Sequence, residues 1–210
     1  MSINVCNDRS MASITSLPSG VSGSSLVLIK TLTASGDNEL DFNDGSSDVV
    51  LDSTYKEYIF KYTDIHPSNE SHFAMNLRTG SSGSYSAATK TSTFFHVYHD
   101  EAGSEAYLEY ASGSDLAQST SDQRLFQGGI DNANDSSVSG EMHLFNPSNT
   151  TFVKHYIATT QGVLDVGGNP YSRCCFTAGY ANTTSAITSV RFKMISGTID
   201  SGTIKMYGVV

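Results

Sequence analysis

The amino-acid sequence predicts an all-β fold, a β-sandwich preceded by an N-terminal arm, and two observations lead to that prediction. Many short stretches alternate apolar and polar residues with a period of two, as strands with one buried face do. The intervals between these stretches are rich in Ser, Thr, Gly and Asn, which favour turns and disfavour helices. At 210 residues the jelly roll is the favoured type of sandwich. The lack of a repeat of fixed period argues against a β-helix.

The predicted elements follow the chain in order. Residues 1–22 show no clear periodicity and are predicted to form an arm or linker, and residues 23–210 are predicted to form one sandwich domain. The alternation predicts strands at Ser25–Thr33, Asp48–Leu51, Tyr55–Ile65, His72–Leu77, Ser92–His99, Glu105–Ala111, Asp122–Phe126, Ser139–Phe145, Thr151–Ala158, Arg173–Tyr180, Ile187–Met194 and Thr203–Tyr207. Residues 80–90 and 128–138 are predicted to be loops because they are rich in Gly, Ser, Asn and Asp.

Turns and faces can be assigned at three places. Asn146–Thr150 contains a proline between two strand-like flanks and predicts a hairpin. Gly197–Gly202 predicts a tight connection between the last two strands. Within Tyr55–Ile65 the alternation places four side chains on one face, those of Tyr58, Phe60, Tyr62 and Asp64.

Charge and hydropathy exclude several classes of function. The formal net charge is −9 and the sequence pI is about 4.9. Phosphate backbones repel such a chain, and no cluster of Lys or Arg offsets the repulsion, so we expect no nucleic-acid binding. No apolar run is long enough for a signal peptide or a transmembrane helix, so we expect no membrane insertion.

The cysteines indicate a chain that is made in a reducing cytoplasm. There are three, Cys6, Cys174 and Cys175. Neighbouring residues on a strand point to opposite faces, so Cys174 and Cys175 are not expected to form a disulfide with each other. One of the two is expected to lie in the core as a small apolar residue.

The histidines offer two possible metal sites. His96 and His99 are three residues apart on one strand, so they should face opposite sides and make a poor pair of metal ligands. His143 and His155 flank the predicted hairpin and, in a suitable register, would be neighbours on one face, with Glu141 close by. Polar residues on a solvated sheet face are the simpler interpretation of this second set.

The acidic loops, residues 37–45 and 131–135, carry oxygen ligands suited to Ca²⁺, but neither has the spacing of an EF-hand, and turn formation explains both. No motif for a nucleophile, a zinc protease or a phosphate-binding loop is present. The sequence therefore predicts that the protein is not an enzyme. It assigns no catalytic, cofactor-binding or metal-binding residue and implies no cofactor.

Several stretches resemble virion structural proteins of tailed bacteriophages, especially phages of marine bacteria. The resemblance lies in Asp48–Phe60, Ile65–Pro67, Gly140–Pro147, Thr151–His155, Ala178–Ile187 and Gly202–Gly208. It covers the chain from about Ser24 to the C-terminus, and it brings no catalytic motif with it. The resemblance implies a place in the phage particle, either in the tail and its fibres or as a capsid accessory protein.

Three functional hypotheses follow. The leading one is a virion structural protein, an assembly module of the tail, its fibres or the capsid decoration, made in the host cytoplasm and released by lysis. The alternative is a glycan-binding adhesin at the tail tip, suggested by the loops at residues 80–90 and 128–138, the first of which carries Tyr85. The third is a polysaccharide-cleaving enzyme with a carboxylate pair drawn from the two acidic loops.

Other virion proteins and further copies of the chain are the expected partners. The apolar strand Leu26–Leu32 and the last strand, Thr203–Tyr207, carry only Lys30 and Lys205 as charges. If either lies at a sheet edge, its unpaired backbone groups invite another chain. We therefore expect a homo-oligomer, and we favour a trimer because closed cyclic symmetry avoids open filaments.

Overall fold

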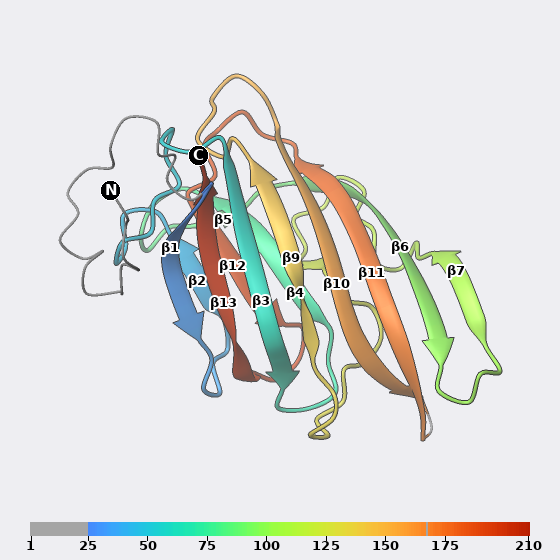
Figure 1. The fold of residues 1–210 in the computed structure, drawn as a ribbon. Helices are drawn as coiled ribbons and strands as arrows, with labels where there is room; N and C mark the ends of the chain where they lie inside the picture. Colours follow the sequence, from blue (N-terminus) through green and yellow to red (C-terminus); the bar gives the residue numbers. More distant parts are fainter. Residues whose placement is uncertain (1–24, 167) are drawn as a thin grey trace, which may run out of the picture.

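Two antiparallel β-sheets packed face to face make up the computed structural model, which describes residues 25–166 and 168–210 (Figure 1). The strands are β1 Leu26–Thr33, β2 Leu40–Asn43, β3 Glu57–Pro67, β4 Phe73–Thr79, β5 Ser86–Ala87, β6 Lys90–Asp100, β7 Ala106–Tyr110, β8 Gln123–Arg124, β9 Val138–Phe145, β10 Lys154–Val166, β11 Asn169–Ala181, β12 Ser189–Met194 and β13 Ile199–Val209. The predicted all-β sandwich is confirmed. The predicted arm, residues 1–22, lies outside the described residues.

The larger sheet has eight strands in the order β1-β13-β3-β9-β10-β11-β6-β7, and it faces the viewer in Figure 1. The smaller sheet lies behind it with the order β2-β12-β4-β5, and β8 pairs with β4. The first and last strands, β1 and β13, are hydrogen-bonded neighbours. This strand order is compatible with a jelly roll. No helix within the described residues has the length and apolarity that crossing a membrane requires.

The core between the sheets is built from aromatic rings that meet at Phe192 of β12. The ring of Phe192 lies 5.5 Å from that of Phe60 on β3 and 5.9 Å from that of Phe73 on β4, measured between centroids. Phe42 of β2 packs edge-on against Phe192. All four side chains are fully buried. Burial of one such side chain contributes roughly 1.5–3 kcal/mol to folding, which is why the alternation of apolar residues fixes which face of each strand turns inward.

The face predicted for β3 is correct except at Asp64. Tyr58, Phe60 and Tyr62 are buried, as predicted, but Asp64 is exposed and Ile65 takes the inward position. Asp64 has a φ of 52°, and the pairing of β3 with β9 shifts register between Tyr62 and Ile65. The extra residue of this β-bulge reverses the alternation beyond it, and a two-residue period cannot foresee that reversal.

The prediction for Gly197–Gly202 is wrong in two respects. The connection between β12 and β13 is shorter, residues 195–198, and it crosses from the smaller sheet to the larger one. Gly202 lies inside β13 with a φ of 119°, and a Cβ there would stand 2.6 Å from the carbonyl oxygen of Asp64. Glycine at this position therefore reflects a close backbone approach to the bulge in β3.

Several further boundaries differ from the prediction. Asp48–Leu51 is not a strand: Ser47 and Asp48 have positive φ values, and Val49 and Leu51 are buried as part of a loop. The strand of this region is β2, which precedes it. The predicted loop at residues 80–90 contains β5, and β10 and β11 are longer than predicted. The predicted hairpin at Asn146–Thr150 is confirmed, since it joins the antiparallel strands β9 and β10.

The sheet edges lie only partly where the sequence suggested. Among the described strands β1 stands at an edge, but β13 lies inside the sheet between β1 and β3. The opposite edge is β7, which projects at the far end of the larger sheet (Figure 1). Every side chain of β7 is exposed. Neither face of β7 is therefore covered by the second layer of the sandwich.

Candidate functional site

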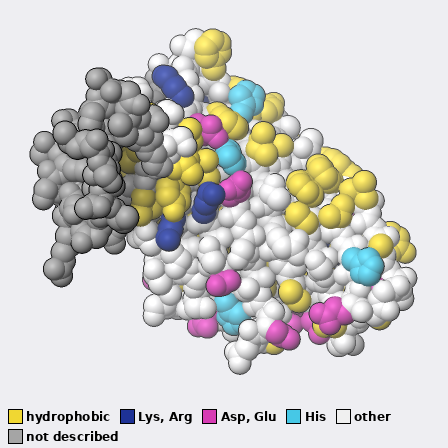
Figure 2. All heavy atoms as spheres, viewed as in Figure 1, with side chains coloured by type: hydrophobic (Ala, Val, Ile, Leu, Met, Phe, Trp, Pro, Cys, Tyr) yellow, Lys and Arg dark blue, Asp and Glu magenta, His cyan; other side chains and the backbone are white. Residues whose placement is uncertain are grey.

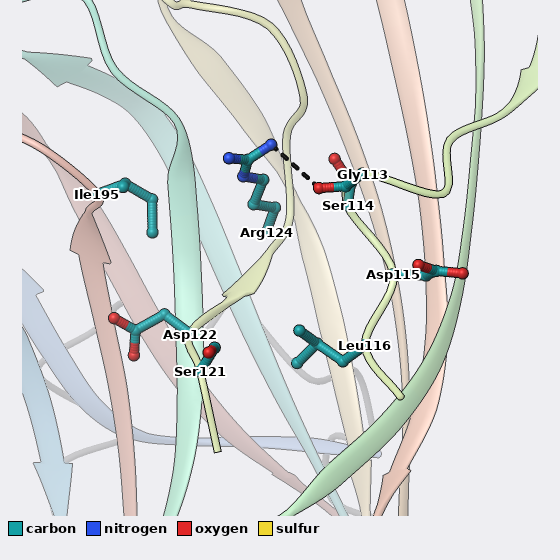
Figure 3. A pocket seen from close by; sticks show the side chains of 8 residues that line it. All are labelled: Gly113, Ser114, Asp115, Leu116, Ser121, Asp122, Arg124 and Ile195. Atoms are coloured by element: carbon teal, nitrogen blue, oxygen red, sulfur yellow. Dashed lines mark hydrogen bonds between the residues drawn. The ribbon is translucent and has the colours of Figure 1, made fainter. Parts of the chain in front are cut away.

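An open polar pocket lies where the segment between β7 and β8 passes from β6 of the larger sheet to β4 of the smaller sheet. Its volume is about 400 Å³. Figure 3 shows the lining side chains, which come from Gly113, Ser114, Asp115, Leu116, Ser121, Asp122, Arg124 and Ile195. Arg124 donates a hydrogen bond of 3.3 Å to the carbonyl oxygen of Gly113 across the pocket (Figure 3). The pocket thus combines two carboxylates, a guanidinium group and two aliphatic side chains.

One wall of the pocket is fixed by the buried amide of Gln123. Its Oε1 accepts hydrogen bonds from the hydroxyls of Ser92 and Tyr156, at 2.5 and 3.2 Å. Its Nε2 donates to the carbonyl oxygen of Ser114 at 2.8 Å. Burial raises the pKa of Tyr156, so its hydroxyl stays protonated and able to donate. These buried hydrogen bonds hold the Ser114 turn in place.

The second wall is fixed by Asp122. Its carboxylate accepts hydrogen bonds from Asn76 and Arg191, both at 2.7 Å. Burial alone would raise the pKa of Asp122, but these two hydrogen bonds and the charge of Arg191 lower it. Behind Asn76 lies Lys90, whose Nζ donates to Asn76 Oδ1 at 2.7 Å and to the Ala88 carbonyl oxygen at 2.9 Å. The Asp122 carboxylate is therefore charged and held in place in this wall of the pocket.

Asp115 and Arg124 are charged, half-buried groups on the pocket lining. The Asp115 carboxylate accepts a hydrogen bond of 2.5 Å from the hydroxyl of Tyr110. Ile195 is 42% exposed at the opposite side. Hydroxyl-binding groups beside an aliphatic surface suit a small polar ligand such as a sugar. No pattern in the sequence marks this pocket, because its residues come from the segment before β8, from the two-residue strand β8 and from the residue after β12.

The outer face of the larger sheet is the second candidate surface, and Figure 2 views it directly. Apolar side chains gather on it over β10, β11, β6 and β7. We call this group the apolar patch, and it consists of Phe95, Val97, Leu108, Tyr110, Ile157 and Phe176. Leu108 is 72% exposed and Ile157 is 51% exposed.

The register of three strands builds the apolar patch. Phe176 of β11 lies opposite Phe95 of β6, and Phe95 lies opposite Tyr110 of β7. Val97 lies opposite Leu108 in the next row. The rings of Phe95 and Phe176 stack with their centroids 4.8 Å apart and their planes at 12°. Exposed stacking of this kind preforms a flat apolar surface.

A charged cluster occupies the middle of the same face. His143 Nδ1 lies 2.5 Å from Glu57, and its Nε2 lies 3.4 Å from Glu141. Lys61 pairs with Glu141 at 3.4 Å. Partial burial would raise the pKa of Glu141, but hydrogen bonds from His143 and Lys61 lower it. Glu57, Glu141, His143 and Lys61 thus make this part of the face polar.

The histidines considered from the sequence do not assemble a metal site. His143 is engaged by Glu57 and Glu141, and the ring of His155 lies against that of Tyr180 at 6.1 Å. His96 is buried and His99 is exposed, as predicted for opposite faces. Among residues 25–166 and 168–210 no group of three or more His, Cys, Asp or Glu is placed to hold a metal ion.

The cysteines of β11 behave as predicted. Cys175 is fully buried, Cys174 is partly exposed on the outer face, and both are free thiols. Burial raises the pKa of the Cys175 thiol to about 12 and also raises that of Cys174. Neither thiol is thus activated as a nucleophile.

The two loops proposed for glycan binding lie at opposite ends of β4. Ser71, just before β4, bridges to Ile130 in the loop at residues 128–138. The loop at residues 80–90 begins directly after β4 ends at Thr79. The two loops therefore cannot line one site. Tyr85 instead packs its ring against the guanidinium of Arg78 at 5.1 Å.

Three carboxylates of the acidic loops take part in turns, whereas Glu39 and Asp41 pair with Arg191 and Arg78. Asp37 accepts the backbone N–H of Ser35, Asp44 accepts that of Leu51, and Asp131 accepts that of Ala133. Each of these contacts stabilises the loop that carries it.

Comparison with known proteins gives no relative. No protein-family model, no curated protein and no solved structure matches the chain.

Proposed function

We propose that the protein is a structural component of a tailed-bacteriophage virion, in which the outer face of the larger sheet packs against another virion protein. The observation that carries the proposal is the apolar patch. Phe176, Phe95 and Tyr110 lie in one row across three neighbouring strands, Val97 and Leu108 lie in the next row, and Ile157 is exposed on the same face. Exposed apolar patches often mark sites of protein–protein contact. A protein partner that covers this surface gains the free energy of apolar burial.

Charge supports a protein partner rather than a nucleic acid. With a net charge of −9, the chain is repelled by packaged DNA. The resemblance of its strand sequences to phage structural proteins supports the viral setting. The turn-forming roles of the acidic-loop carboxylates support a non-catalytic module. Homo-oligomerisation, with a trimer favoured, belongs to the same proposal.

Mass spectrometry of purified phage particles tests this function. We expect the protein to co-purify with particles in a fixed copy number relative to the major capsid protein. Its presence in infected lysate together with its absence from particles would contradict the proposal. Ile157→Ser should lower incorporation into particles because it removes part of the apolar patch. Thr159→Ser, on the neighbouring row of β10, is the matched control and should be incorporated normally.

A second candidate function, glycan binding at the tail tip, is favoured by the polar pocket of Figure 3. Asp115 and Arg124 would bind sugar hydroxyls, while Leu116 and Ile195 would contact the apolar face of the ring. A glycan array with the wild-type protein and Arg124→Ala tests this function. Arg124→Ala should lose binding, and Lys205→Ala, on β13 of the larger sheet, should retain it. A wild-type protein that binds no glycan excludes this candidate.

A further inference from the structure

The free edge of β7 carries unused backbone hydrogen-bonding groups. Asp100 N–H donates to the Glu105 carbonyl oxygen, and Ala111 N–H donates to that of Phe94. Because hydrogen-bonded pairs alternate along an antiparallel ladder, the backbone groups of Tyr107 and Glu109 also point toward β6. Those of Ala106, Leu108 and Tyr110 point away from the sheet. No described strand lies on that side of β7.

The side chains around this edge leave room for another strand. All five residues of β7 are exposed, so the second layer of the sandwich does not reach them. Leu108 and Tyr110 stand on the outer face within the apolar patch, and Tyr107 stands on the other face with its ring 5.3 Å from that of Tyr98. The only charged residue in β7 is Glu109, so little guards the edge against pairing.

The sequence of β7 is complementary to itself in one antiparallel register. When the pairing is centred on Leu108, Tyr107 faces Glu109 of the second copy and Ala106 faces Tyr110 of the second copy. Centring on Tyr107 sets Glu105 against Glu109, and centring on Glu109 sets that carboxylate against its own copy. Like charges directly opposite each other destabilise a sheet. Of these three registers only the first avoids them, and it also pairs all five residues of β7 with β7 of the second copy.

The same register also satisfies the backbone. In an antiparallel pair, directly opposite residues exchange both N–H···O bonds at every second position. Centring on Leu108 makes the exchanging pairs Leu108 with Leu108, and Ala106 with Tyr110. These three residues are the ones whose backbone groups point away from β6.

We propose that β7 pairs with β7 of a second copy of this chain about a two-fold axis through Leu108. The two larger sheets then form one continuous sheet, and the apolar patch of one copy adjoins that of the other at Leu108. The inference does not rest on a place in the virion. It gives a two-fold dimer in place of the trimer favoured from the sequence, wherever the assembly is used.

A five-residue strand buries little area, so we expect the free dimer to be weak. Interfaces below about 1,200 Å² are typical of transient contacts. A covalent trap therefore suits the first test. Cα atoms of a hydrogen-bonded antiparallel pair lie about 5.5 Å apart, within the range that a disulfide bridges.

The first experiment uses single cysteines in a Cys6→Ser, Cys174→Ser background, with oxidised glutathione and non-reducing gels. Leu108→Cys should form a disulfide-linked dimer, because residue 108 faces its own copy. Ala106→Cys and Tyr110→Cys should each stay monomeric, while a mixture of the two should form heterodimers. Leu108→Cys that stays monomeric, or equal cross-linking of all three variants, would overturn the proposal.

The second experiment needs no cysteine and measures sedimentation velocity over a concentration series. Leu108→Pro removes an N–H that points away from β6, so the strand can keep its place in its own sheet. We expect the sedimentation coefficient to rise with concentration for the wild type and for Leu108→Val, and to stay constant for Leu108→Pro. Association that survives Leu108→Pro, including a trimer, places the contact elsewhere and refutes the β7 pairing. Virion incorporation is measured separately, so failure here leaves the proposed function standing.

Discussion

Lys90 gives the stability of this protein a pH dependence that can be measured. Its side chain is fully buried beneath the polar pocket, where Nζ donates to Asn76 Oδ1 and to a backbone carbonyl oxygen. Burial lowers the pKa of Lys90 from 10.5 to about 8, with the charge of Asp122 opposing the shift and that of Arg191 adding to it. The native state therefore releases the Lys90 proton more readily than the unfolded chain.

The direction of the effect follows from proton binding. Between pH 8 and pH 10.5 the unfolded chain holds this proton and the native state does not, so the free energy of unfolding rises with pH. Holding the buried charge at neutral pH costs roughly 3 kcal/mol, at about 1.4 kcal/mol for each pKa unit. As the native state loses the Lys90 proton, this cost falls, and the free energy of unfolding rises by roughly 1 kcal/mol between pH 8 and pH 9.

Urea unfolding of the wild type and of Lys90→Met at pH 7, 8 and 9 measures this contribution. The difference between the two free energies of unfolding should grow by about 1 kcal/mol from pH 8 to pH 9 in favour of the wild type. Cys175, whose pKa is raised to about 12, opposes the trend in both proteins and cancels in the difference. Lys205→Met controls for the loss of one exposed positive charge. If the free energies of unfolding of the wild type and of Lys90→Met change with pH in the same way, the pKa of Lys90 is not lowered in the native state.

Two further substitutions test the packing of the larger sheet. Tyr62→Phe should lower the free energy of unfolding by about 1–2 kcal/mol, because the buried Tyr62 hydroxyl is hydrogen-bonded to Thr160 Oγ1 at 2.5 Å. An unchanged denaturation midpoint would show that this hydrogen bond contributes nothing to stability. Gly140→Ala should cost about 1–3 kcal/mol by overpacking, since a Cβ there would stand 2.2 Å from the Thr159 carbonyl oxygen. Its control is Gly113→Ala, whose Cβ would meet no atom within 4 Å; equal losses for the two would contradict the steric explanation.

Most of the fold could be predicted from the sequence because alternation records which side of a strand is buried. Tyr58, Phe60 and Tyr62 were assigned to one face, and all three are in the core. The assignment of Cys174 and Cys175 to opposite faces was correct for the same reason. In each case the information is local to one strand, so no knowledge of its neighbours was required.

The errors occur where a neighbouring strand decides the backbone. The bulge at Asp64 and the glycine at position 202 belong together, because the Asp64 carbonyl oxygen occupies the space of a Cβ at Gly202. Strand β10 continues past its predicted end through Gly162, where a Cβ would stand 2.5 Å from a methyl carbon of Val138. Residues far apart in the chain thus set these features. The alternation of apolar and polar residues marks neither the bulge at Asp64 nor the extension of β10.

The candidate surfaces were out of reach of the sequence for a further reason. Phe95 and Phe176 each look like an isolated apolar residue on the outer side of a strand, which is common and needs no explanation. They become one surface only because β11 lies beside β6 in a register that sets position 176 against position 95. The self-complementarity of Ala106–Tyr110 has meaning only once β7 is known to be an edge. In this fold the core is encoded strand by strand, whereas the surfaces available to a partner are created by strand order, so function has to be argued from the assembled sheet.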